Sequence, residues 1–127
     1  MRRRVEAREL MFRVNPARMR CGRPLGLRDS ALLALVAEGM GAREIAVLRA
    51  SDIAIVGGRV AIAIPHREGK RSIILEVDHG ARLIAWLNDR HLWHTDALVF
   101  TAFRGPITVR GISAVLDRYR RRRRNRR

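Results

Sequence analysis

Two alternating apolar segments around a Gly-Gly pair constrain this chain more than any other feature. "DIAIV" and "RVAIAI" alternate large and small apolar residues, and Gly57 and Gly58 lie between them. Glycine adopts the positive φ angles that a tight hairpin needs, so the pattern predicts an antiparallel hairpin. Pro65 closes the second strand, "HREGK" forms a turn, and "RSIILEV" supplies a third strand. Residues 52–77 are therefore predicted to form a three-stranded antiparallel meander.

The apolar spacing before this meander is helical. "RDSALLALVAEG" has Asp29 or Ser30 near a helix start and Gly39 just past its end. Its apolar residues are nearly continuous, which predicts a helix buried on most sides. A shorter helix is expected over 42–49, with Ile45 facing the core.

Helical spacing returns after the meander. Asp78 is predicted to cap a helix that runs to about Leu92, and "ALVF" is a short extended segment. Thr108 is predicted to cap a last helix whose apolar stripe comprises Val109, Ile112, Val115, Leu116 and Tyr119. The order of elements predicts an α+β fold, in which a helical bundle packs against a small three-stranded antiparallel sheet.

The charge indicates a polyanionic partner. The 127 residues include 27 basic and 12 acidic ones, which gives a formal net charge of +15. Such a balance favours nucleic acid or an anionic membrane surface. Lys70 is the one lysine, so codon bias can explain arginine over lysine, but it does not explain the excess of basic residues. Residues 118–127 hold eight arginines without interleaved bulky apolar residues, and this composition favours DNA over a membrane.

Compartment and domain organisation follow from simple patterns. Cys21 is the one cysteine, so an intramolecular disulfide is impossible and a reducing compartment is expected. No signal peptide or membrane-spanning run is apparent, which predicts a cytoplasmic protein. We expect a basic arm over 1–26 with a short helix around 5–14, one domain over 27–119, and an arginine-rich tail over 120–127.

The segment "RDSALLALVAEGMGAREIAVLRASDI" resembles the pattern "RDxALLxLLxxTGLRxSELxxLxxxDI" of tyrosine recombinases, the phage integrase family. "REGKRSIILEV" is similar to the family's hairpin, and "ALVF" and "PITVRGISAVLDRY" resemble the segments that follow. The resemblance covers about 15–119 and implies the first part of the catalytic domain. Residues in register with the pattern are Arg28, Asp29, Ala31, Leu32, Leu33, Leu35, Gly39, Glu44, Leu48, Asp52 and Ile53.

The departures from this pattern concern the catalytic groups. The resemblance places the family's first catalytic arginine at position 41, which is Gly41 here. Arg43 lies two residues on, which on a helix is a rotation of about 200°. Lys70 is the candidate for the family's catalytic lysine, with Arg67 as the alternative. The family's second catalytic motif contains a His-x-x-Arg and the nucleophilic tyrosine, and the resemblance places it after the last helix. The sequence there consists mainly of arginines instead.

These groups matter because transesterification at a DNA phosphate needs a nucleophile, two guanidinium groups and a general acid. Tyr119 lies on the apolar stripe of the last helix, which favours core packing over a nucleophilic role. The sequence therefore predicts a DNA-binding, integrase-like protein of DNA integration and recombination that does not cleave DNA alone. Two alternatives are half of a split recombinase completed in trans, and an inhibitor that binds another recombinase chain.

The expected partner is duplex DNA, contacted through its phosphate backbone. The predicted contact residues are Arg43, Arg67, Lys70, Arg71, Arg120, Arg121, Arg122, Arg123 and Arg124. The alternative for the tail is the frameshifted or truncated end of a decayed gene.

No cofactor and no metal site are predicted. His91 and His94 lack a third or fourth ligand nearby in the sequence. His66 is interpreted either as a phosphate contact or as a solvated turn residue. Glu44 and Asp52 are expected to have structural roles. We also expect the turn over 65–71 to project from the sheet with Lys70 or Arg67 exposed.

Overall fold

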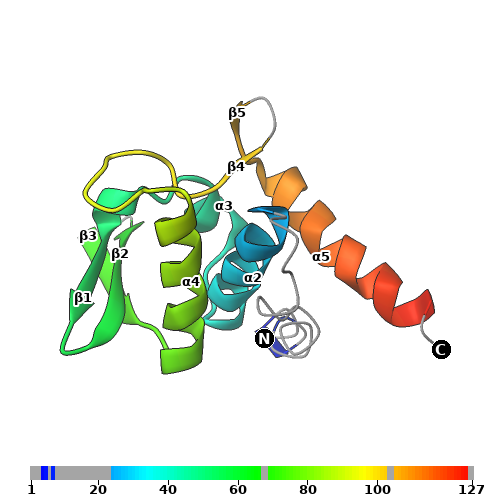
Figure 1. The fold of residues 1–127 in the computed structure, drawn as a ribbon, viewed down its shortest axis with the longest axis horizontal. Coiled ribbons are helices and arrows are strands. Elements are labelled where there is room, and N and C mark those ends of the chain that lie inside the picture. The colour runs from blue at the N-terminus through cyan, green and yellow to red at the C-terminus, as the bar shows by residue number, and fades with distance from the viewer. Residues whose placement is uncertain (1–3, 6, 8–23, 67–68, 103–104, 126–127) are drawn as a thin grey trace.

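The chain folds into helices packed beside a small sheet, as Figure 1 shows. The computed structural model describes residues 4, 5, 7, 24–66, 69–102 and 105–125. The elements are α2 (Pro24–Ala37), α3 (Ala42–Ala46), the 3₁₀ turn η2 (Ala50–Asp52), β1 (Ile53–Val56), β2 (Arg59–His66), β3 (Gly69–Ile74), α4 (Val77–Asp89), β4 (Thr101–Ala102), β5 (Gly105–Pro106) and α5 (Val109–Asn125). The predicted α+β class is confirmed.

The three-stranded meander is also confirmed, in the order β1-β2-β3. Gly57 and Gly58 have φ of 58° and 78°, a left-handed pair that forms the tight β1–β2 turn. Pairing between β2 and β3 continues to His66 opposite Gly69, so β2 runs past Pro65. Strand β1 pairs only with residues 59–62 of β2, so β3 is the single paired neighbour of β2 at Pro65. Proline, which has no N–H to donate, is tolerated where one side of a strand is unpaired.

Helix α4 lies between the sheet and α2 (Figure 1). Gly80 lets α4 approach β2, because a Cβ at this position would come within 3.0 Å of the Val60 side chain. Leu83 and Leu87 are buried, and Trp86 donates a hydrogen bond to the Val99 carbonyl at 2.8 Å. One face of the sheet is therefore covered by a helix that is itself backed by α2.

The predicted starts of two helices are wrong. Helix α2 begins at Pro24, so Asp29 and Ser30 lie inside the helix and are buried. Proline is suited to the first turn of a helix because its missing N–H would have no partner there. The N-cap of α4 is Glu76 and not Asp78, whose carboxylate instead accepts a hydrogen bond from Arg82 Nε at 3.2 Å.

The last helix starts as predicted and extends further. Thr108 Oγ1 accepts a hydrogen bond from the Gly111 N–H at 3.0 Å, which confirms the predicted cap. Helix α5 continues to Asn125, so the arginine run of residues 120–124 has a helical backbone. Helix α5 projects from the body of the molecule (Figure 1). The β4–β5 pair before it was not predicted. Among the described residues, none of the helices combines the length and apolarity that a membrane crossing requires.

A buried carboxylate joins α2 to α5. Asp29, which is 1% exposed, accepts two hydrogen bonds from Arg28, at 3.1 Å from Nε and 3.0 Å from Nη2. Its other oxygen accepts the Tyr119 hydroxyl at 2.8 Å and Arg118 Nη1 at 3.3 Å. Tyr119 is buried, as its place on the apolar stripe predicts. This network secures α5 against the centre of the bundle.

We predict that Asp29→Ala lowers the free energy of unfolding by about 3–5 kcal/mol, because it leaves the buried Arg28 guanidinium without its carboxylate. Urea denaturation measures the change. Asp78→Ala is the matched control, since Asp78 is 70% exposed and its pair with Arg82 should contribute less than about 1 kcal/mol. A cost for Asp29→Ala as small as that of the control would contradict the structural role of this network.

Candidate functional site

The segment that carries the recombinase-like pattern forms a tight turn between α2 and α3. Gly39 has a φ of +93°, which L-residues with side chains rarely adopt, and Met40 is buried. Gly41 is the N-cap of α3 in extended conformation, and its N–H donates to Glu44 Oε1 at 2.8 Å. This bond returns from the first turn of α3 to its N-cap, so the predicted structural role of Glu44 is supported.

Arg71 brings the sheet to this turn. It lies in β3 and not in the turn before it, and its Nη2 is 3.1 Å from Glu44 Oε2 and 3.3 Å from Glu44 Oε1. Both side chains are partly exposed, at 48% and 26%. A guanidinium from the sheet thus lies beside the turn that contains Gly41, held by the carboxylate that also caps α3.

The other predicted DNA contacts are spread over the chain. Arg43 is exposed on α3. Arg67 and the side chain of Lys70 lie outside the described residues, and so does the prediction that one of them projects from the turn. The side chains of Arg120–Arg124 also lie outside the description, although their backbone belongs to α5. The structure brings Arg71 to the Gly41 turn and places Arg43 on the surface of α3, while the other side chains of the set lie outside the described residues.

Gly41 has space for a side chain. A Cβ built on it would meet Glu44 Oε1 at 3.6 Å, which is ordinary contact, and its φ of −75° suits any residue. By contrast, a Cβ at Gly39 would lie 3.2 Å from Arg4 Nε on a left-handed backbone. The absence of a side chain at position 41 is therefore not required by packing, whereas glycine at 39 is required by its conformation.

A cavity of about 200 Å³ lies beneath the turn. Its walls are mostly apolar, and Arg4 at its edge donates a hydrogen bond to the Ala37 carbonyl at 3.2 Å. The lining residues are Arg4, Val36, Gly39, Met40, Gly41, Ala42 and Ile112. Because this wall offers few convergent polar groups, it has the character of a packing gap between α2, α3 and α5 and not of a substrate pocket.

One His-x-x-Arg spacing does occur, from His79 to Arg82, in α4 and not after the last helix. His79 is buried with Nδ1 2.7 Å from Glu38 Oε2, and Arg82 Nη1 donates to Ser30 Oγ at 2.9 Å. Both side chains therefore connect α4 to α2 and do not lie beside Gly41. Sequence reasoning missed this role because the contacting residues of α2 are more than 40 positions away.

The remaining candidates have structural surroundings. His91 and His94 are exposed and adopt positive φ angles of 53° and 63° in the loop after α4. Within the described ranges, the possible metal-ligand cluster contains neither of them. Asp52 Oδ2 accepts the Arg49 N–H at 3.0 Å, which agrees with its predicted structural role at the start of β1.

We predict that Gly41→Ala and Gly41→Arg change the free energy of unfolding by less than about 0.5 kcal/mol, because position 41 is exposed and unstrained. Gly39→Ala should cost about 1–2 kcal/mol, since alanine must adopt a left-handed backbone there. Thermal or urea denaturation of the three variants tests the contrast. Equal losses at both positions would show that Gly41 is needed for packing.

Comparison with solved structures places the fold. The post-cleavage complex of the XerH site-specific recombinase with a palindromic difH substrate superposes with a TM-score of 0.64 and 18% identity, over 91% of this chain and 34% of that one. The pre-cleavage complex with difH superposes with a TM-score of 0.65 and 19% identity, over 90% of this chain and 35% of that one. No family model and no curated protein matches the chain. The chain thus spans about a third of those recombinases and has a recombinase-like fold, as its sequence predicts.

Proposed function

We propose that the chain binds duplex DNA through its phosphate backbone and does not cleave it alone. The observation that carries this proposal is the recombinase-like fold, because the similar XerH chains were solved bound to difH substrates before and after cleavage. The net charge of +15 supports it, since a protein that neutralises phosphates releases condensed counterions. The reducing interior of a cell is the compartment that the single cysteine favours.

The surroundings of Gly41 support a role without cleavage. At the position where the family resemblance places a phosphate-binding arginine there is no side chain, and the nearby Arg71 guanidinium is paired with Glu44. Tyr119 is 5% exposed and its hydroxyl donates to the buried Asp29, so it is not presented to a DNA strand. A buried phenol whose hydroxyl is bound to a carboxylate of the core is poorly suited to attack a phosphodiester.

A second candidate function is that of one part of a recombinase, with the missing catalytic groups supplied by another chain. This candidate rests on the recombinase-like fold, which the chain shares with part of each XerH chain. Binding to a complete recombinase in the absence of DNA would instead indicate an inhibitor. Mixing the chain with a partner that carries a His-x-x-Arg box and a tyrosine, and then assaying strand transfer, separates these functions.

We predict no covalent protein–DNA adduct from the chain alone on nicked suicide duplexes. Gly41→Arg should not create one, because a single guanidinium supplies neither a nucleophile nor a general acid. Denaturing gels of labelled DNA provide the measurement, with Tyr119→Phe as the control. An adduct that forms with the unaltered chain and disappears in Tyr119→Phe would overturn the non-cleaving function.

We predict that the arginine run supplies non-specific affinity for DNA. A deletion from residue 118 would remove Arg118 and Tyr119, which hold Asp29, so substitution of Arg120–Arg124 by glutamine is the cleaner change. If about half of these five arginines contact phosphates, the slope of log affinity against log salt should flatten by about 2. Affinity should fall equally for unrelated sequences, because phosphate contacts do not read bases.

Salt titrations of the unaltered chain and the glutamine variant on two unrelated duplexes measure this effect. A single Arg90→Gln variant, at the C-cap of α4, is the control for an arginine outside the run and should leave the slope unchanged. Identical slopes for the unaltered chain and the five-site variant would exclude DNA contact by the run. A loss confined to one duplex would indicate base recognition instead.

A further inference from the structure

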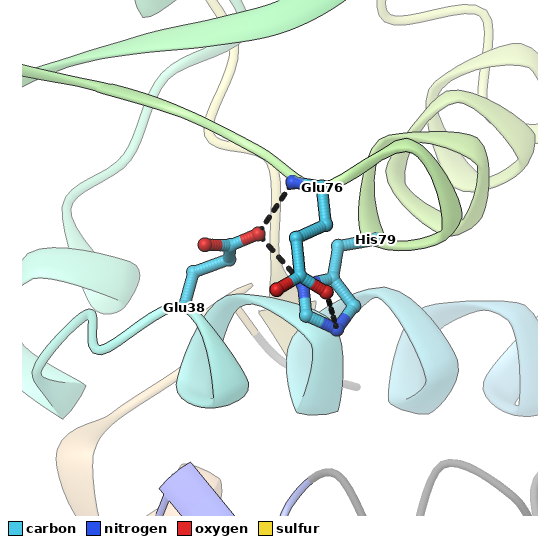
Figure 2. Close-up of side chains that lie close together, drawn as sticks. All are labelled: Glu38, Glu76 and His79. Carbon is cyan, nitrogen blue, oxygen red and sulfur yellow. Dashed lines mark hydrogen bonds and ion pairs between the residues drawn. The ribbon is translucent and has the colours of Figure 1, made fainter.

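Three side chains that could bind a cation meet where the end of α2 lies against the start of α4. Figure 2 shows Glu38, just after α2, facing His79 of α4, with Glu76 at the N-cap of α4. One potential ligand atom from each residue lies within 4.8 Å of the other two. In the part of the chain that the structure describes, this is the one such group of three.

The His79 ring is held in one orientation. It is 3% exposed, and Nδ1 lies 2.7 Å from Glu38 Oε2, which also accepts the Glu76 N–H at 2.6 Å. A hydrogen bond from Nδ1 to a carboxylate leaves the lone pair of the neutral ring on Nε2. Histidines that bind metals usually have this second contact, because it fixes the tautomer and raises the basicity of the ligating nitrogen.

The separation of Nε2 from the Glu76 carboxylate is close to the separation of two ligands on one metal ion. Nε2 faces Glu76 Oε2 across 3.8 Å, which is longer than a hydrogen bond. A zinc ion binds nitrogen and carboxylate oxygen at about 2.0–2.2 Å, so tetrahedral coordination would set the two atoms about 3.4 Å apart. A shift of a few tenths of an ångström in the Glu76 side chain, which is 55% exposed, would provide this geometry.

The local charge also favours a cation. Two carboxylates flank one imidazole, and Glu38 follows the C-terminal end of α2, where the helix dipole is negative. The start of α4 presents the positive end of a dipole, but the N-cap residue there is Glu76, whose carboxylate offsets it. Imidazole with carboxylates is a donor set that suits zinc and other divalent transition metals, and not magnesium, which prefers oxygen alone.

We propose that Glu76 and His79 Nε2 bind a divalent transition metal such as Zn²⁺, with Glu38 orienting His79 and water completing the coordination. Both ligands belong to the start of α4, and Glu38 links the metal-bound histidine to the end of α2. This site is independent of the proposed DNA binding, and its ligands lie on other elements than Arg71 and α5.

Thermal denaturation of the full chain with added ZnCl₂ tests the site. At roughly ten times its dissociation constant, zinc should raise the Tm by about 4 °C, whereas MgCl₂ at the same concentration should not. Glu76→Gln should abolish the shift and keep the fold, because Glu76 is exposed. Asp89→Asn, at the last turn of the same helix, is the matched control and should retain the full shift.

Cobalt(II) provides a second measurement that does not depend on stability. Its visible absorption should show bands of a nitrogen- and oxygen-ligated ion with the unaltered chain, and these should disappear in Glu76→Gln and in His79→Gln. A double His91→Gln, His94→Gln variant should keep them. Loss of the bands in that double variant, or an unchanged zinc shift in Glu76→Gln, would overturn the site and leave the cluster as an ion-paired contact between α2 and α4.

Discussion

The buried carboxylate of Asp29 is the interaction on which the arrangement of the helices depends. A charge in the interior is costly unless it is paired and hydrogen-bonded, and here Arg28, Arg118 and Tyr119 provide the pairing. Two of these partners come from α5, about 90 positions further along the chain. Helix α2 contacts α3, α4 and α5, so the bonds of Asp29 fix the start of α2 and the middle of α5 relative to each other.

A second carboxylate organises the candidate site. Glu44 caps α3 through the Gly41 N–H and pairs with Arg71 of β3, so it joins the helical part to the sheet. This pairing has a functional consequence, because a guanidinium that neutralises a carboxylate is less available to a phosphate. The recombinase-like frame is thus maintained by contacts within the protein at the point where the family resemblance implies contacts to DNA. Binding through α5 requires none of these groups.

Local patterns predicted the elements whose causes are local. The meander followed from period-two alternation and from Gly57 and Gly58, whose positive φ angles need no distant partner. Thr108 was recognised as a cap because its bond to the Gly111 N–H spans three residues. Errors arose where a residue suited to a local role has distant partners in the fold. Asp29 was read as a cap because aspartate is common there, yet its actual partners include residues of α5.

The sequence by itself determined the α+β class, the order of strands, the basic charge and the glycine at position 41. These depend on periodicity, composition and identity, which are properties of neighbouring residues or of single positions. Only the tertiary structure decided that Glu44 pairs with Arg71 across 27 positions and that Glu38 meets Glu76 and His79 across about 40. The physical reason is that a buried or half-buried charge takes the partner that packing brings within reach, and no local spacing specifies which helix end will lie opposite it.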